Sequence, residues 1–148
     1  DSHVMAALIR RFYEANLKSE EKVICWGDGS PMREFLYVDD LAEACLFILK
    51  NLPSKGKKSP IYKNLENVNW INVGSNYEIS IKHLANKIAE KFNYKGNIIW
   101  DSNKPNGTPR KKLDTSFLDN LGWKAKTNLD IGISNTIKFF KEEYYKLN

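Results

Sequence analysis

Apolar residues recur at helical spacing in five stretches of the chain. In the first stretch, Val4, Leu8 and Phe12 lie one turn apart and form a single apolar face. Polar and charged residues fill most of the other positions, which is typical of helices that pack one face against a core. The pattern predicts five helices, over residues 4–17, 41–52, 81–92, 115–121 and 129–146.

Two of these helices carry residues that are typical of helix N-termini. Asp40 is followed three residues later by Glu43, which is the spacing of a capping box with aspartate in place of serine. Ser80 precedes the third helix, and Ile79 and Leu84 occupy the two positions of a hydrophobic staple around it. We therefore expect Asp40 and Ser80 to be N-caps.

Short apolar runs between the helices predict strands. Residues 22–26 are apolar at neighbouring positions, so we expect an interior strand that is covered on both faces. Residues 33–38, 70–73 and 97–100 are further extended candidates, and the polar residues 53–67 predict a long connection.

Helices and short strands alternate along the chain, so the predicted fold class is mixed α/β. The strands are too few and too short for a complete doubly wound sheet. No G-x-G-x-x-G motif follows a strand, so the sequence predicts no dinucleotide-binding turn. The pattern favours the smaller lobe of a two-lobed enzyme, without the Rossmann sheet.

The charge of the chain argues against two classes of partner. The 148 residues have a formal net charge of +5, but their basic residues form separate local clusters rather than the continuous stripe of a nucleic-acid interface. No apolar run approaches the roughly 20 residues needed to cross a bilayer. With no signal peptide in the sequence, we expect a soluble cytoplasmic domain.

The two cysteines, Cys25 and Cys45, both lie in apolar patterns. We expect both to be buried thiols with a structural role. Their number and spacing predict neither a metal site nor a disulfide framework.

Trp26 and Arg33 are the clearest candidates for ligand binding. Trp26 ends a strand before the glycine-rich residues 27–31, and it is either a core tryptophan or a stacking surface for a nucleobase. Arg33 lies inside a partly apolar run, and it either forms a surface salt bridge or grips a phosphate with two parallel N–H groups.

Three further features could contribute to the same chemistry. Arg11 lies on the side of its helix that bears Ala7, where a small neighbour leaves room for a ligand. Residues 104–111 form a loop stiffened by two prolines, which is either an exposed basic turn or an anion clamp. His3 begins the first helix, and a lone histidine in such a place is usually not catalytic.

Taken in order, these motifs resemble those of the GDP-L-fucose synthases, the epimerase–reductases of the extended short-chain dehydrogenase class. The resemblance covers nearly the whole chain but only the C-terminal half of that family. The matching segments are Ser-His-Val at 2–4, Ala-Leu-Ile-Arg-Arg-Phe at 7–12, Trp-Gly at 26–27, Arg-Glu-Phe-Leu at 33–36, Val-Asp-Asp at 38–40, Ile-Asn-Val-Gly at 71–74 and Lys-Pro-Asn-Gly-Thr-Pro-Arg-Lys at 104–111.

The resemblance implies that residues 1–148 are a GDP-sugar-binding domain. The family converts GDP-4-keto-6-deoxy-D-mannose to GDP-L-fucose by 3,5-epimerisation and NADPH-dependent 4-reduction, and it is usually homodimeric. The implied acid–base residue for epimerisation is His3. The implied substrate-binding residues are Arg11, Arg33 and Lys111 at the pyrophosphate, Trp26 at the nucleotide and Asn97 at another substrate contact.

The chain also departs from the family pattern. Ala6 stands where the family often has proline, and Asn106 where it often has aspartate. The glycine-rich NADP turn and the Tyr-x-x-x-Lys pair are not found in these residues, so the resemblance implies that the main NADP(H) site is absent and that the isolated chain is inactive. The sequence leaves two alternatives open: the substrate lobe of another nucleotide-sugar epimerase, dehydratase or reductase, and a free-standing basic module for RNA or an acidic partner.

Overall fold

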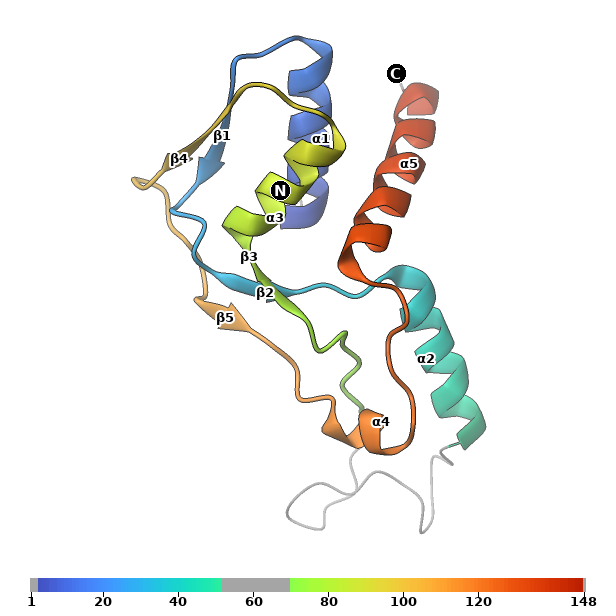
Figure 1. The fold of residues 1–148 in the computed structure, drawn as a ribbon. Coiled ribbons are helices and arrows are strands. Elements are labelled where there is room, and N and C mark those ends of the chain that lie inside the picture. The colour runs from blue at the N-terminus through green and yellow to red at the C-terminus, as the bar shows by residue number, and fades with distance from the viewer. Residues whose placement is uncertain (1–2, 52–69, 148) are drawn as a thin grey trace. The chain divides into compact units, whose positions relative to one another are not determined.

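The computed structural model describes residues 3–51 and 70–147 (Figure 1). The chain divides into two compact units. Unit 1 comprises Asp1–Arg33, Ile79–Lys111 and Ile133–Asn148, and unit 2 comprises Glu34–Glu78 and Lys112–Gly132. Short strands alternate with helices in the described residues, which confirms the mixed α/β class. The predicted connection at 53–67 lies outside the described residues.

Unit 1 is built on a pair of parallel strands. Strands β1 (Lys22–Trp26) and β4 (Asn97–Asp101) pair in register from Lys22 with Asn97 to Trp26 with Asp101. Helix α1 (Val4–Leu17) packs against β1 and against α3 (Ile81–Lys91). Helix α5 (Leu129–Leu147) supplies Ile133 and Ile137 to the buried residues of the chain.

The core of unit 1 confirms the predicted faces of its helices. Phe12 of α1 is completely buried, and its ring meets that of Tyr94 edge to face at 5.4 Å between centroids. Tyr13 contacts the rings of Phe140 and Tyr144 of α5 at 5.4 and 4.9 Å. Each such aromatic pair adds about 0.5–1.5 kcal/mol to the free energy of area burial. These contacts hold α1 and α5 together within the unit.

The prediction that β1 is covered on both faces is wrong. Val23 and Cys25 are buried, whereas Ile24 is 51% exposed and Trp26 is 59% exposed. Because successive side chains of a strand point to opposite faces, β1 has one face in the core and one open face. The open face carries Trp26 at the C-terminal end of the strand.

A second small sheet has the strand order β3-β2-β5. Strand β5 (Arg110–Lys111) runs parallel to β2 (Met32–Glu34), and β3 is Glu78–Ser80. The predicted extended run at 33–38 is a strand only as far as Glu34. Its last predicted residue, Val38, is already the first residue of helix α2 (Val38–Asn51).

Unit 2 has its own small core around α2 and the short helix α4 (Ser116–Asn120). Ala44, Leu118 and Trp123 are buried together there. Ile71 and Val73 pack against this cluster, but residues 70–73 form no strand, so that prediction is wrong. The segment makes side-chain contacts in place of a ladder within the described residues, and the amide of Asn72 donates to the carbonyl of Asp114 at 3.1 Å.

Asp40 is not the N-cap of α2, contrary to the prediction. The helix begins two residues earlier, and Asp40 lies in its first turn at 4% exposure. Its Oδ2 accepts a hydrogen bond from the backbone N–H of Thr127 at 2.9 Å. The aspartate therefore ties the residues after α4 to the start of α2, which the local capping pattern did not indicate.

The prediction that Cys45 is buried is wrong, although Cys25 is buried as expected. Leu41 and Leu49 of α2 are exposed as well, whereas Ala44 is buried and Phe47 and Ile48 are half-buried against the core of unit 2. The helix has apolar residues on more than one side, so its periodicity did not determine which side is buried.

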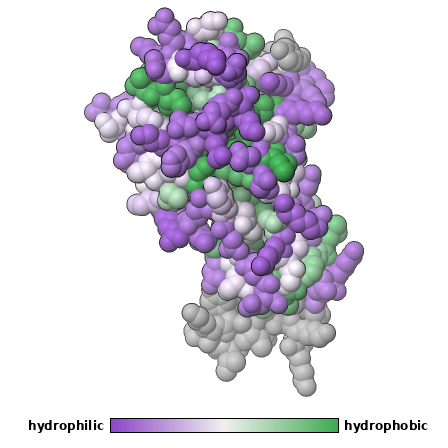
Figure 2. All heavy atoms as spheres, viewed as in Figure 1, coloured by the Kyte–Doolittle hydropathy of each residue, from purple (hydrophilic) through white to green (hydrophobic). Residues whose placement is uncertain are grey.

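The ends of the other helices follow the sequence prediction more closely. Ser80 is the N-cap of α3, and its Oγ accepts from the backbone N–H of His83 at 3.2 Å. Gly122 follows α4 with a φ of +95°, a conformation that favours glycine. None of the helices in the described ranges combines the length and the hydropathy that a bilayer crossing requires. Figure 2 shows a face on which hydrophilic residues predominate and apolar ones gather in small groups.

Candidate functional site

Trp26 stands on the open face of β1, at the C-terminal end of the strand. The backbone N–H of the next residue, Gly27, donates to the carbonyl of Asp101 at 2.9 Å, so pairing with β4 continues past the ring. The Nζ of Lys104 lies 5.7 Å from the ring centroid, within the range of a cation–π contact. The structure thus presents an aromatic plate that is fixed at its base and has a cation on one side.

The turn after Trp26 is held by its own hydrogen bonds. The backbone N–H of Ser30 donates to Oδ1 of Asp28 at 2.8 Å. This bond is the largest cause that lowers the pKa of Asp28 below its usual range, and the side chains of Ser30 and Asn106 act in the same direction. Gly29 has a φ of +77°, which lets the chain reverse toward β2.

Arg33 and Lys111 lie side by side on paired strands. They are register partners in the parallel pairing of β2 and β5. Arg33 is half-buried, and its Nη1 donates to the carbonyl of Met32 at 2.7 Å. A guanidinium has five N–H donors, so this bond leaves others that can reach a ligand. Lys111 is exposed.

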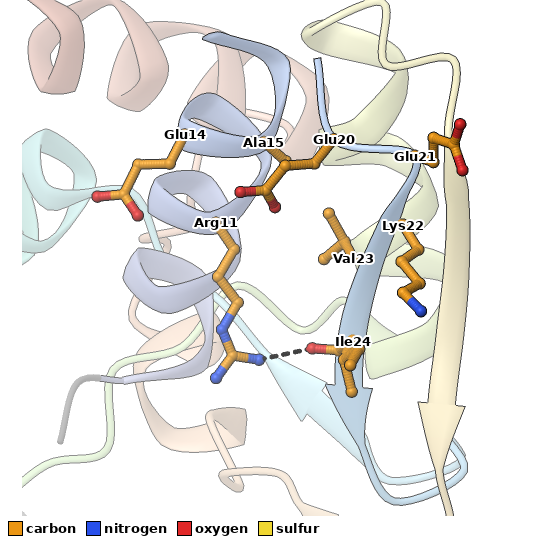
Figure 3. Close-up of a pocket in the computed structure, with 8 residues that line it drawn as sticks. All are labelled: Arg11, Glu14, Ala15, Glu20, Glu21, Lys22, Val23 and Ile24. Carbon is orange, nitrogen blue, oxygen red and sulfur yellow. Dashed lines mark hydrogen bonds between the residues drawn. The ribbon is translucent and has the colours of Figure 1, made fainter. Parts of the chain in front are cut away.

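Arg11 lies at the opposite edge of β1 from β4. Its Nη1 donates to the carbonyl of Ile24 at 3.0 Å (Figure 3). It lines an open groove of about 620 Å³ between α1 and β1 that also contains Glu14, Glu20 and Glu21. Three carboxylates make most of this groove unfavourable for an anion. Arg10, the preceding residue, instead pairs with Glu14 at 2.7 Å.

The other two predicted site residues lie apart from Trp26. Asn97 begins β4, four residues from Asp101, which is about 13 Å along the strand. His3 is exposed and is the N-cap residue of α1, but its side chain makes no capping hydrogen bond. It lies eight residues before Arg11, which corresponds to about 12 Å of helix. The structure therefore brings Trp26, Arg33 and Lys111 to one region more clearly than it does the other candidates.

Two residues of the predicted basic loop make contacts in this region. Lys104 is placed over Trp26, and Asn106 is hydrogen-bonded to Asp28, 78 residues earlier in the chain. The sequence marked the loop as stiff and basic. It contained no signal for which earlier segment the loop contacts.

The described residues do not fit a dinucleotide cofactor. None of the strands in ranges 3–51 and 70–147 leads through a glycine-rich turn into a helix. Strand β1 is followed by such a turn, but the chain continues from there into β2 and not into a helix. Phosphates of NADP are held by amides at a helix N-terminus that follows a glycine-rich turn, so this part of the chain does not supply that site.

The arrangement is suited to binding a nucleotide with an anionic tail. An exposed indole can stack a base, and a guanidinium beside an ammonium can hold phosphate oxygens. The chemistry that the exposed ring and the neighbouring cations support is ligand binding.

Comparisons with known proteins agree with that chemistry. Residues 1–63 match the model of the NAD dependent epimerase/dehydratase family. The chain is 45% identical to a putative GDP-L-fucose synthase 2 of Arabidopsis thaliana over 142 residues, which is 96% of this chain and 39% of that protein. It is 39% identical to the GDP-L-fucose synthase of Escherichia coli strain K12, covering 96% of this chain and 43% of that protein. The chain thus spans about two fifths of the length of these curated relatives.

Solved structures give the same result. A GDP-6-OMe-4-keto-L-xylo-heptose reductase from C. jejuni has a TM-score of 0.84 and 27% identity, covering 96% of this chain and 48% of that one. A GDP-L-fucose synthetase from Naegleria fowleri bound to NADP has a TM-score of 0.78 and 26% identity, covering 97% and 41%. Over nearly its whole length the chain is therefore similar to the corresponding part of GDP-L-fucose synthases, and its residues 1–63 match the NAD dependent epimerase/dehydratase family.

Proposed function

We propose that this chain is the GDP-sugar-binding part of a GDP-L-fucose synthase, which converts GDP-4-keto-6-deoxy-D-mannose to GDP-L-fucose by 3,5-epimerisation and NADPH-dependent 4-reduction. The observation that carries the proposal is the loop of residues 102–109, which lies against the turn that joins Trp26 to Arg33. The loop brings Lys104 to the ring of Trp26 and passes beside Arg33. An aromatic ring with cations nearby suits a base linked to a diphosphate.

In this proposal each residue has a separate task. The guanine base stacks on Trp26, while Arg33 and Lys111 hold the pyrophosphate. Arg11 reaches the ligand from the edge of β1, and Asn97 contacts another part of the substrate. His3 transfers protons at C3 and C5, which are acidic because the C4 ketone stabilises the enolate. An imidazole can both donate and accept such a proton.

The reduction step is not assigned to these residues. The described part of the chain does not fit NADP, so we assign hydride transfer to parts of the relatives that this chain does not span. We infer that the isolated chain binds substrate without reducing it. We also propose that the enzyme works as a homodimer in the cytoplasm, without a nucleic-acid or membrane partner.

Calorimetry with GDP tests the binding role. In the full-length protein that carries this chain, Arg33→Ala should weaken GDP binding about 10- to 100-fold, because it removes charge-assisted hydrogen bonds worth about 1.5–3 kcal/mol. Arg10→Ala is the matched control, since Arg10 pairs with Glu14 on the exposed surface of α1. Absence of GDP binding, or equal affinities of the wild type and Arg33→Ala, would contradict the proposal.

Solvent exchange tests the role of His3. In D₂O, the wild-type enzyme should incorporate deuterium at C3 and C5 of GDP-4-keto-6-deoxymannose, as followed by NMR. His3→Asn should lose this incorporation while it retains GDP affinity, because the exposed side chain makes no capping hydrogen bond. Unchanged incorporation in His3→Asn would remove the acid–base assignment and leave the binding proposal intact.

A second function has a specific observation in its favour. The chain is 32% identical over 143 residues to a GDP-L-colitose synthase of Yersinia pseudotuberculosis. We therefore keep a GDP-sugar enzyme with another sugar substrate as the alternative. This alternative would be favoured if the full-length protein binds GDP but does not turn over GDP-4-keto-6-deoxymannose.

A further inference from the structure

The turn of residues 27–30 and the loop of residues 102–109 are joined through one side chain. Oδ1 of Asn106 accepts a hydrogen bond from the backbone N–H of Asp28 at 2.8 Å. The same side chain also lies close enough to the Asp28 carboxylate to help lower its pKa. Asn106 therefore bonds the backbone of Asp28 and lies beside its side chain.

The absence of a side chain at Gly27 leaves room for the Asn106 side chain. Its φ is +75°, a conformation that side chains rarely adopt. A Cβ at this position would also clash with Oδ1 of Asn106. The turn thus lacks a side chain at the place that the amide of Asn106 occupies, and an alanine there would push the loop away.

The 102–109 loop contains one cation of the candidate site, Lys104, and passes beside another, Arg33. Lys104, two residues before Asn106, lies over the ring of Trp26 at 5.7 Å. Gly107, the next residue after Asn106, lies beside Arg33, whose Nη2 would be 3.7 Å from a Cβ on that glycine. Asn106 thus lies between the two points where the loop meets Trp26 and Arg33.

The two ends of the loop are attached independently. At its start, the backbone N–H of Lys104 donates to the carbonyl of Asp101 at 3.1 Å. At its end, the backbone N–H of Met32 donates to the carbonyl of Pro109 at 2.8 Å. Loss of the Asn106 contact would therefore leave the loop connected to both sheets while freeing its middle.

We propose that Asn106 is a positioning residue, which fastens the 102–109 loop to the 27–30 turn so that Lys104 and Arg33 are already arranged around Trp26 before the nucleotide diphosphate arrives. The inference rests on the proposed function. A loop that is ordered in advance does not have to lose its conformational freedom on binding, and this raises affinity. Asn106 itself need not touch the ligand.

Variants on both sides of the contact test the proposal in the full-length protein that carries this chain. Asn106→Ala removes the acceptor, Asn106→Asp keeps it, and Gly27→Ala displaces it from the turn. Asn103→Ala is the control, because Asn103 lies in the same loop and its exposed side chain has no hydrogen bond recorded within the described ranges. Two readouts are measured for each variant: the hydrogen exchange of the Asp28 amide by NMR without ligand, and the affinity for GDP by calorimetry.

Asn106→Ala should speed exchange of the Asp28 amide, which loses its acceptor, and weaken GDP binding about 3- to 10-fold, the loss expected for one hydrogen bond. Asn106→Asp should keep exchange of the Asp28 amide slow, because its carboxylate still accepts that N–H, and Asn103→Ala should change neither readout. Gly27→Ala should act like Asn106→Ala, and the double variant should be no worse than either single one because both break the same contact. Equal melting temperatures would separate this effect from a loss of folding.

Two results would overturn the proposal. One is wild-type exchange and wild-type GDP affinity in Asn106→Ala; the other is faster exchange with unchanged affinity, which would mean that the fastening does not position the site. Arg33→Ala, measured in parallel, separates these outcomes from failure of the proposed function. If Arg33→Ala also leaves GDP affinity unchanged, the binding function is wrong, while the amide exchange still decides whether Asn106 holds the loop.

Discussion

Replacing Trp26 with alanine tests whether this ring is a stacking plate for the base. Trp26 is 59% exposed, so its removal takes little apolar area out of the core and should leave the fold intact. Base stacking on an aromatic ring contributes about 1–3 kcal/mol. A base on the face covered by Lys104 would displace a cation–π contact worth about 0.5–1 kcal/mol at an exposed site. The net loss in Trp26→Ala is therefore about 1.5 kcal/mol, or roughly tenfold in affinity.

Calorimetry with two ligands measures this loss. GDP contains both base and phosphates, whereas inorganic pyrophosphate contains only the part that cannot stack. Trp26→Ala should weaken GDP binding roughly tenfold and leave pyrophosphate binding unchanged, and Trp26→Phe should lie between the wild type and alanine. The reasoning is refuted if GDP affinity changes less than about twofold, or if both ligands lose affinity equally.

Two further predictions concern buried groups. Asp40→Ala should lower the free energy of unfolding by about 2–3 kcal/mol in urea titrations, because the Thr127 N–H loses its acceptor and the α2 N-terminus loses a carboxylate. Asp40→Asn should lower it by less, since an amide oxygen can still accept from Thr127. Equal losses in the two variants would argue against a role for this hydrogen bond. Burial raises the pKa of Cys25, so the unfolded state loses this proton first and stability should fall as pH rises above about 8.5. Cys25→Ala should lessen that fall, and iodoacetamide followed by mass spectrometry should label the exposed Cys45 of the native protein well before Cys25.

Local sequence signals predicted most of the helices correctly. The positions of α1, α3, α4 and α5 follow from apolar residues three and four apart, which are neighbours on any helix whatever surrounds it. The cap at Ser80 is equally local, since its hydroxyl bonds an N–H three residues away. Local rules were less reliable for α2, where Asp40 finds a partner in Thr127 rather than in its own helix.

For the candidate site, the sequence indicated the residues and the tertiary structure showed their contacts. The sequence identified Trp26, Arg33 and the stiff basic loop, because aromatic, cationic and turn-forming residues have a chemistry that does not depend on the fold. Only the tertiary structure showed that the open face of β1 carries Trp26, that Lys104 lies over it, and that Asn106 reaches Asp28 across 78 positions of sequence. Burial and long-range hydrogen bonds depend on which segments pack together, and the residue pattern of one segment contains no record of its distant neighbour.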